Sequence, residues 1–212
     1  MTADAVRSAF SVSLESCREH ESELGQLDSV TGDGDHGSGM VRGFTAACSA
    51  IAALEDRDST MISAAGNAFA DAAGGASGAL WGVFIQSVGT ALREGAITPS
   101  RVVAALRTGE AQMERIGKSK PGDKTLLDTL VPFLYALEIE VSDGSTLSKA
   151  WTGALVGARE ATEATSKMIA KRGRSSVLGE RSLGTVDPGA RSLLNVLEAL
   201  LPVITSEEAE QQ

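Results

Sequence analysis

The sequence predicts an all-α fold, an eight-helix up-and-down antiparallel barrel or bundle. Apolar residues recur at helical spacing along most of the chain, as in the run Met40, Phe44, Ala47 and Ile51. No stretch alternates apolar and polar residues for long enough to indicate a strand. Alanine is the commonest residue on the apolar faces, and small side chains let neighbouring helices approach closely.

Eight segments show this spacing, and each predicts one helix. In chain order they cover residues 6–17, 40–54, 61–72, 80–91, 98–116, 126–137, 147–168 and 187–200. Two of them open on a capping residue followed by proline, Thr98-Pro99 and Asp187-Pro188, a common helix start. The polar end Ser206–Gln212 is expected to fray. Because no segment has the composition of an interdomain linker, residues 1–212 are expected to form a single domain.

Composition narrows the possible function. The 28 acidic residues outnumber the 19 basic ones, and the net charge of −9 argues against nucleic acid as a partner. A nucleotide ligand stays possible, because a bound cation can reverse the local field. The sequence has no apolar run of about 18 residues and no signal-peptide core, and Cys17 and Cys48 are too few for a disulfide framework. We therefore expect a cytoplasmic protein with no membrane partner.

Many of the 23 glycines gather in clusters after the first, third, fifth and seventh predicted helices. In an up-and-down arrangement, these connections lie at the same end. The connections near residues 55–59 and 142–145 are not enriched in this way. One rim of the barrel is therefore expected to be glycine-rich, which lets backbone N–H groups approach a ligand closely. The clusters are Gly25–Gly43, Gly74–Gly82, Gly117–Gly122 and Gly173–Gly189.

The first cluster carries three carboxylates, Asp28, Asp33 and Asp35, interleaved with glycines just before a predicted helix. Such dense carboxylates repel one another, and a hard divalent cation such as Mg²⁺ would relieve the repulsion. An EF-hand is excluded, because counting twelve residues from Asp33 or Asp28 reaches Phe44 or Gly39 rather than glutamate. An acidic helix cap is the alternative, although a single aspartate would suffice for it.

Two glycine-rich helix starts are candidate phosphate sites, because the N–H groups of a first helical turn are free to bind anions. The first contains His36, Gly37, Ser38 and Gly39, and the second contains Gly75, Ala76 and Ser77. The imidazole of His36 could donate to a phosphate oxygen, or it could simply fix the turn. Trp81, near the second start, is expected to pack in the core rather than to stack on a base.

The third cluster leads into a helix through a cationic loop that ends at Thr125, a candidate nucleotide-binding residue. It is not a P-loop, since Asp123 separates the glycine from the lysine and no strand precedes it. Its lysines Lys118, Lys120 and Lys124 are expected either to be solvated or to face phosphate.

The fourth cluster is a long irregular loop, a common form for a lid or binding loop. Its arginines Arg174 and Arg181 are candidate anion clamps. Their alternative role is to pair with Glu180 or with other acidic residues. Carboxylates, basic side chains and free N–H groups on one rim are together what a magnesium–nucleotide complex requires.

Four motifs resemble the nucleotide-binding L subunit of dihydroxyacetone kinases, and they occur in that family's order. They are Gly32–Met40 (GDGDHGSGM), Gly74–Gly82 (GGASGALWG), Gly122–Asp128 (GDKTLLD) and Gly173–Gly189 (GRSSVLGERSLGTVDPG). The resemblance implies an eight-helix barrel with ADP or ATP at one end.

The resemblance also implies a set of site residues. Asp28, Asp33 and Asp35 match the ligands of two Mg²⁺ ions. His36, Gly37, Ser38, Ala76 and Ser77 match phosphate-contacting positions, Gly117 and Leu126 match positions around the base and ribose, and Arg174, Asp187, Pro188 and Gly189 match a closing loop. The family often has asparagine where Gly39 stands, so a side-chain contact to phosphate is expected to be missing there.

The resemblance implies a function as the phosphoryl-donor half of a kinase for dihydroxyacetone or a related ketose such as erythrulose. A separate K subunit would hold the ketose. The nucleotide would either exchange as ATP or stay bound as ADP, to be rephosphorylated by a phosphotransferase-system protein. No residue decides between these branches. The alternative is a non-catalytic regulatory subunit that binds Mg²⁺ and nucleotide.

Overall fold

The computed structural model describes residues 2–54, 58–93 and 95–210. Its α-helices are α1 (Ala3–Glu19), α2 (Glu21–Thr31), α3 (His36–Ala52), α4 (Asp58–Ala73), α5 (Gly75–Ala91), α6 (Pro99–Gly117), α7 (Leu127–Ser142), α8 (Leu147–Ala164) and α9 (Pro188–Glu210). The 3₁₀ segments η1 (Thr165–Lys167) and η2 (Arg174–Ser182) lie between α8 and α9. No strand occurs in these three ranges, which confirms the predicted all-α class.

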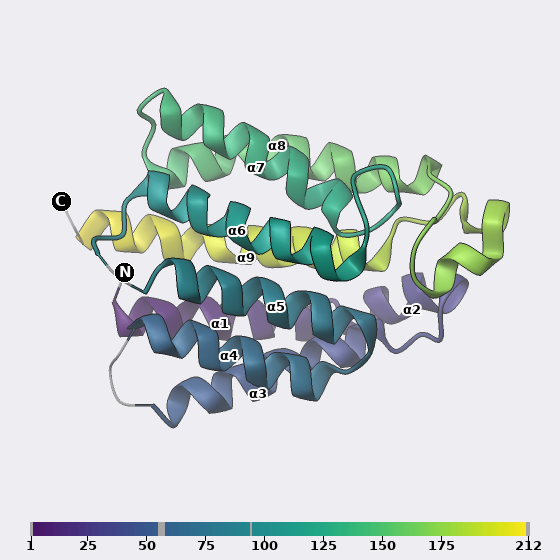
Figure 1. Ribbon diagram of the computed structural model, residues 1–212, viewed down its shortest axis with the longest axis horizontal. Coiled ribbons are helices and arrows are strands. Elements are labelled where there is room, and N and C mark those ends of the chain that lie inside the picture. The colour runs from purple at the N-terminus through teal and green to yellow at the C-terminus, as the bar shows by residue number, and fades with distance from the viewer. Residues whose placement is uncertain (1, 55–57, 94, 211–212) are drawn as a thin grey trace.

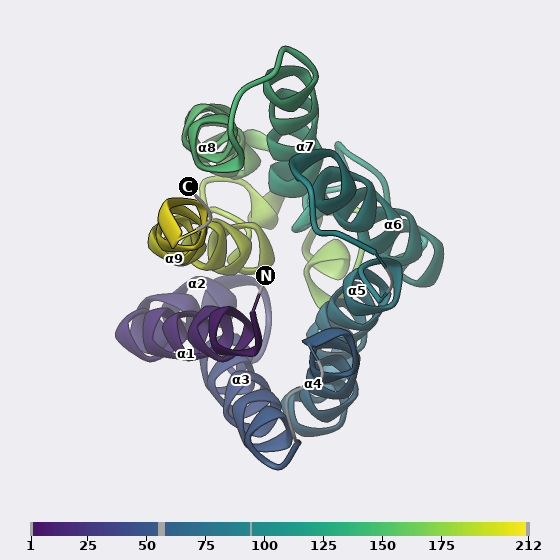
Figure 2. The same cartoon turned by 90° about the vertical axis from the view of Figure 1, so that its left-hand side faces the viewer.

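The helices α1 and α3 to α9 stand in a closed ring, seen end-on in Figure 2. Each of α3 to α8 packs against the next helix in the chain, and α1 closes the ring by packing against both α3 and α9. This is the predicted eight-helix antiparallel barrel. The additional helix α2 was not predicted, because Leu24 is its only buried apolar residue and leaves no helical period in the sequence.

The glycine-rich connections lie together at one end of the barrel, as predicted. This end is on the right of Figure 1, where α2 leads into α3, α4 into α5, α6 into α7 and α8 into α9. The start of α1 and the end of α9 lie near the opposite end. Four barrel helices, α3, α5, α7 and α9, therefore start at the glycine-rich end, with the positive ends of their dipoles there. The connection between α3 and α4 includes residues 55–57, which are outside the described residues.

The barrel interior is lined by apolar side chains. Phe44, Phe69, Trp81 and Phe84 form a chain of ring contacts, with Trp81 only 2% exposed. The prediction that Trp81 packs in the core is thereby confirmed. Close helix contacts depend on glycine: a Cβ added at Gly43 would lie 2.5 Å from the ring of Phe69. An apolar cavity of about 260 Å³ lies between the helices, away from the acidic residues at the glycine-rich end.

The end of the chain departs from expectation. The prediction that Ser206–Gln212 frays is wrong for residues 206–210, because α9 continues to Glu210. Glu208 there accepts a hydrogen bond from the backbone N–H of Leu147 at 2.6 Å, so it caps the start of α8. Residues 211–212 are outside the described part of the chain. Within that part, none of the helices has the length and hydropathy needed to cross a membrane.

Candidate functional site

The three predicted aspartates converge at the glycine-rich end. Asp28 lies on the last turn of α2, while Asp33 and Asp35 lie in the connection to α3. One carboxylate oxygen from each lies within 4.8 Å of those of the other two. Glycine permits this turn: Gly34 has φ +78°, and a Cβ added at Gly32 would lie 2.3 Å from an oxygen of Asp28.

The charges of this cluster favour a cation. Desolvation and the neighbouring charge of Asp33 raise the pKa of Asp35. Desolvation alone would also raise the pKa of Asp33, but the hydrogen bond and charge of Arg174 lower it. Asp35 is the N-cap residue of α3, yet its side chain makes no capping hydrogen bond. Oxygen donors that repel one another fit Mg²⁺.

His36, the first residue of α3, is buried and has protein partners on both ring nitrogens. Its Nδ1 lies 3.2 Å from the Oγ of Ser77 on α5, and its Nε2 lies 2.9 Å from the Oγ of Ser192 on α9. Burial lowers its pKa, against the raising effect of the Asp28 charge. These contacts favour the alternative in which the imidazole fixes local structure. The backbone N–H of His36 points to Asp28, with 3.3 Å between the nitrogen and Oδ2.

The start of α5 is open in the way an anion site requires. Gly74 and Gly75 have φ values of +73° and +61°, and a Cβ added at either would meet no atom within 4 Å. Ala76 is exposed and Ser77 is half-buried. The first N–H groups of a helix have no partner within the helix, so this start can bind phosphate through its backbone.

The start of α3 is more crowded. A Cβ added at Gly37 would lie 2.1 Å from the carbonyl oxygen of Glu21, so glycine is needed for α2 and α3 to approach. The hydroxyl of Ser38 donates to the carbonyl of Asp35 at 3.0 Å and accepts from Arg42 at 3.1 Å. A Cβ added at Gly39 would make only an ordinary 3.4 Å contact, which leaves room for a side chain there.

The positions assigned to the base and ribose lie at the connection from α6 to α7. Gly117 ends α6, and the side chain of Thr125 accepts a hydrogen bond from the N–H of Leu127 at 3.2 Å. Leu126 is 5% exposed and packs against the start of α9, where a Cβ on Gly189 would lie 3.6 Å from its own. Leu126 therefore offers little open surface of its own.

Residues 168–187, which lead from the end of η1 to α9, are called the closing loop here. This loop reaches the acidic cluster through Arg174, which forms an ion pair with Asp33. At the other end of the loop, Asp187 is partly buried and precedes Pro188, the first residue of α9. Its Oδ1 accepts a hydrogen bond from the N–H of Ala190 at 2.8 Å, and burial of the carboxyl raises its pKa to about 7. Asp187 thus caps α9.

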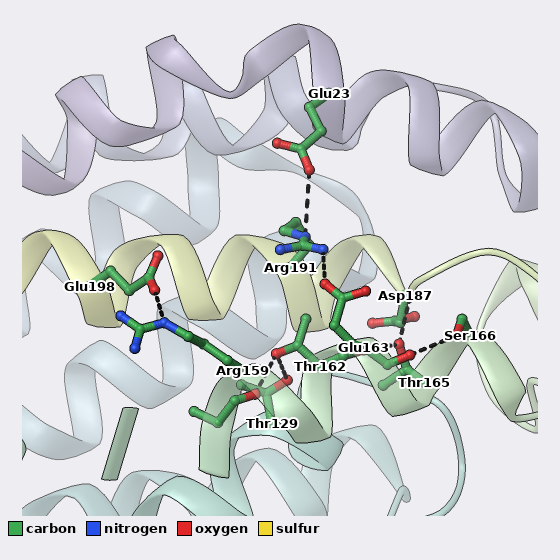
Figure 3. A network of polar contacts seen from close by, with 11 residues as sticks. Glu23, Thr129, Arg159, Thr162, Glu163, Thr165, Ser166, Asp187, Arg191 and Glu198 are labelled. Carbon is green, nitrogen blue, oxygen red and sulfur yellow. Dashed lines mark hydrogen bonds and ion pairs between the residues drawn. The ribbon is translucent and has the colours of Figure 1, made fainter. Parts of the chain in front are cut away.

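A network of polar contacts ties α2 to α8 and α9 beside the site (Figure 3). Arg191 on α9 lies between two carboxylates, with its Nε 3.5 Å from Glu23 on α2 and a second ion pair to Glu163 on α8. The N–H of Asp187 donates to the side chain of Thr165 at 2.9 Å. The network holds the helix that carries Asp28 against the start of α9.

Sequence reasoning missed several residues that shape the site. Ser192 contacts His36 from a position 156 residues away, which no local pattern reveals. Asp128 accepts hydrogen bonds from the N–H groups of Gly122 and Thr125 at 2.5 and 2.8 Å, and so it shapes the loop before α7. Both alternatives for Lys124 were wrong: it is 3% exposed and bonds to backbone carbonyls of the closing loop.

The fold and these contacts define a class of protein: an all-helical barrel with an acidic cluster and open helix starts at one end. The chain belongs to the DAK2 domain family, which it matches over residues 30–202. It is also 35% identical to the ADP-binding subunit DhaL of the PEP-dependent dihydroxyacetone kinase of Escherichia coli, covering 85% of this chain and 87% of that subunit. The resemblance seen in the four motifs is confirmed.

Longer relatives contain a similar segment. The chain is 40% identical to the L-erythrulose kinase of Pectobacterium atrosepticum over 97% of its own length, but it spans only 35% of that enzyme. The crystal structure of the dihydroxyacetone kinase from C. freundii in complex with AMP-PNP and Mg²⁺ superposes with a TM-score of 0.69 at 28% identity, covering 93% of this chain and 33% of that one.

Proposed function

We propose that this chain binds a magnesium–nucleotide complex and is the phosphoryl-donor half of a kinase for dihydroxyacetone or a related short-chain ketose. One observation carries the proposal: the carboxylates of Asp28, Asp33 and Asp35 converge within 4.8 Å beside the start of α3. Bound Mg²⁺ would supply charge neutralisation for the phosphates. The nucleotide-binding relatives, DhaL of Escherichia coli and the C. freundii kinase, support the same conclusion.

Different groups of residues have different proposed roles in binding. The three aspartates hold Mg²⁺, and we propose two ions, as the resemblance implies. The N–H groups at Gly75, Ala76 and Ser77 hold phosphate oxygens at the start of α5. At the start of α3, Gly37 and Ser38 add free backbone N–H groups. The N–H groups of the neighbouring His36 and Gly39 already donate to Asp28 and to the carbonyl of Asp35, so these two residues border the phosphates. Gly117, Thr125 and Leu126 border the nucleoside, while Arg174 and the segment Asp187–Pro188–Gly189 close the site from the other side.

None of the residues named above is assigned to the sugar substrate. We propose that a separate K subunit or domain holds the ketose, as the resemblance implies. The erythrulose kinases among its relatives make a four-carbon ketose as plausible a substrate as dihydroxyacetone. Residues 1–212 would then act as a single nucleotide-binding domain.

The first experiment is native mass spectrometry of the purified protein with and without Mg²⁺. The proposal predicts a complex with nucleotide that depends on Mg²⁺. ADP that survives purification would place the chain in the phosphotransferase-system branch, with a phosphoryl donor protein as a further partner. Freely exchanging ATP would place it in the direct branch. Absence of any nucleotide complex in either condition would contradict the proposal.

The second experiment tests the aspartates and catalysis together. Asp33→Ala should abolish phosphate transfer to the ketose when a K subunit is supplied, and it should weaken Mg²⁺–ADP binding by calorimetry. Asp143→Ala is the matched control, because Asp143 is an exposed aspartate just after α7, at the opposite end of the barrel. Nucleotide binding without transfer by the unaltered protein, with any K subunit tested, would favour the regulatory alternative instead.

A further inference from the structure

The side-chain ammonium of Lys124 is buried at the base of the closing loop. The residue is 3% exposed, which is rare for lysine unless its charge is satisfied. Its Nζ lies 2.5 Å from the carbonyl oxygen of Ser182, 2.6 Å from that of Thr185 and 3.3 Å from that of Met168. An ammonium group has three protons, so each carbonyl can accept one of them.

These three carbonyls belong to both stems of the closing loop. Met168 lies in the stem that leaves α8, whereas Ser182 and Thr185 lie in the stem that returns to α9. The two stems also contact each other directly: the N–H of Ala170 donates to the hydroxyl of Ser182 at 2.9 Å. Arg174 lies between the stems, on η2. Lys124 thus joins the two ends of the segment that carries Arg174.

The residues before Lys124 hold the first stem as well. The carbonyl of Asp123 accepts from the N–H of Lys171 at 3.0 Å, and its carboxylate accepts from the Nε of Arg172 at 3.2 Å. The side chain of Lys171 donates to the carbonyl of Gly122 at 2.8 Å. The loop before α7 and the closing loop therefore form one connected unit.

The local backbone is consistent with a specific role. Lys124 has φ +60°, a conformation that costs a residue other than glycine free energy and persists only where surrounding contacts enforce it. Burial lowers the pKa of Lys124, and the nearby charge of Asp187 opposes that shift. The buried cation thus faces carbonyls together with a carboxyl group of the loop it holds.

We infer that Lys124 is a positioning residue: it fixes both stems of the closing loop, residues 168–187, and so holds Arg174 over the acidic cluster. This inference rests on the proposed function only for its effect on nucleotide binding. The effect on the loop itself follows from the contacts alone. Lys124 would not touch the nucleotide; it would act through the loop.

The test is limited trypsinolysis of Lys124→Met under native conditions, with cleavage sites identified by mass spectrometry. Methionine has a similar length but no donors. Cleavage at Lys171, Arg172, Arg174 and Arg181 should become at least about tenfold faster than in the unaltered protein, since local opening that requires about 1.4 kcal/mol less free energy gives that factor. Lys149→Met, an exposed lysine on α8, is the matched control and should cleave at the original rate.

Nucleotide binding is measured on the same variants. Lys124→Met should weaken ADP binding in the presence of Mg²⁺, while Lys149→Met should not. Faster loop cleavage with no ADP binding in any variant, the unaltered protein included, would contradict the proposed function but support the role of Lys124. Loop cleavage within twofold of the original rate, in a variant that still unfolds cooperatively, would overturn the role of Lys124.

A measurement on the unaltered protein covers the case in which Lys124→Met fails to fold. The ammonium protons of Lys124, bound to three carbonyls and buried, should give a slowly exchanging ¹H–¹⁵N signal at low temperature. The exposed Lys149 should give none under the same conditions. If no lysine ammonium is protected from exchange, the inference is wrong.

Discussion

The Nε2 atom of His36 lies 2.9 Å from the Oγ of Ser192, and this contact determines which ring nitrogen carries the proton. Ser192 donates its own hydroxyl proton to the carbonyl of Gly189 at 3.0 Å, so it can only accept from His36. In the neutral ring, Nδ1 then accepts from the hydroxyl of Ser77. One imidazole thus links the starts of α3, α5 and α9.

The first prediction concerns this tautomer. His36 should carry its proton on Nε2, whereas His20 should carry one on Nδ1, which lies 2.8 Å from the carbonyl of Ser16. Ser192→Ala should lower the free energy of unfolding by about 1–3 kcal/mol, since a buried ring N–H loses its acceptor. Nitrogen-15 NMR of the two histidines measures the tautomers, and chemical denaturation measures the stability.

Ser192→Thr keeps the hydroxyl and is the control for this prediction. It should preserve the His36 tautomer even if the added methyl group costs some stability. Finding the proton of His36 on Nδ1 in the unaltered protein would contradict the argument, because the hydroxyl of Ser77 would then have to accept rather than donate.

The second prediction compares two glycines at the start of α3. Gly37→Ala should destabilise the protein by about 1–3 kcal/mol, because the new Cβ would lie 2.1 Å from a backbone carbonyl that cannot move alone. It should also weaken Mg²⁺ binding, since α2 carries Asp28. Gly39→Ala is the matched change two residues on, where the contact is an ordinary 3.4 Å. Urea unfolding measures the free energy of unfolding, and calorimetry measures the affinity for Mg²⁺. Equal losses of both quantities in the two variants would show that the close approach of α2 and α3 has no importance.

Much of the fold follows from the sequence because helical periods are local. The seven connections of an eight-helix antiparallel barrel are compatible with few arrangements of the helices. The glycine clusters in alternate connections indicated the end at which the candidate site lies. The helix α2 was missed because Leu24 is its only buried apolar residue. The convergence of Asp28, Asp33 and Asp35 could be predicted because the three aspartates lie within eight residues of one another. Ser192 and Lys124 were not, because each acts on a segment far away in the chain.

The third prediction is a pH dependence that Asp187 gives to stability. Its folded pKa is raised to about 7, so the folded state binds a proton more tightly than the unfolded chain. The stability from this group is complete below about pH 4, the unfolded value, and is lost as the pH rises towards 7. Asp187→Asn keeps a capping side chain without a charge. Its stability relative to the unaltered protein should therefore rise by on the order of 1–2 kcal/mol between pH 5 and pH 8.

Guanidinium chloride unfolding of both proteins at pH 5 and pH 8 measures that difference. Asp143→Asn, at the other end of the barrel, controls for the loss of one acidic charge. A difference between Asp187→Asn and the unaltered protein that is the same at both pH values would show that Asp187 is ionised throughout, in spite of its burial.

The fourth prediction concerns the ion pair between Arg174 and Asp33. A cation at the acidic cluster and the guanidinium of Arg174 both need the carboxylate of Asp33, so they compete when no nucleotide is present. Arg174→Ala should therefore strengthen Mg²⁺ binding in the absence of nucleotide by about two- to fivefold, as expected for an exposed ion pair. It should also raise the pKa of Asp33, which Arg174 now holds down.

In the presence of ADP, Arg174→Ala should instead weaken the binding of Mg²⁺ and ADP, because the phosphates lose Arg174 as a partner. Calorimetry with Mg²⁺ alone and with Mg²⁺ and ADP separates the two effects, and carboxyl carbon-13 NMR follows Asp33. Arg174→Lys keeps the charge but not the bidentate geometry, so it should retain most of the shift in the pKa of Asp33 and less of the ADP affinity. If Arg174→Ala weakens both kinds of binding equally, the arginine supports the fold of the loop and does not compete for Asp33.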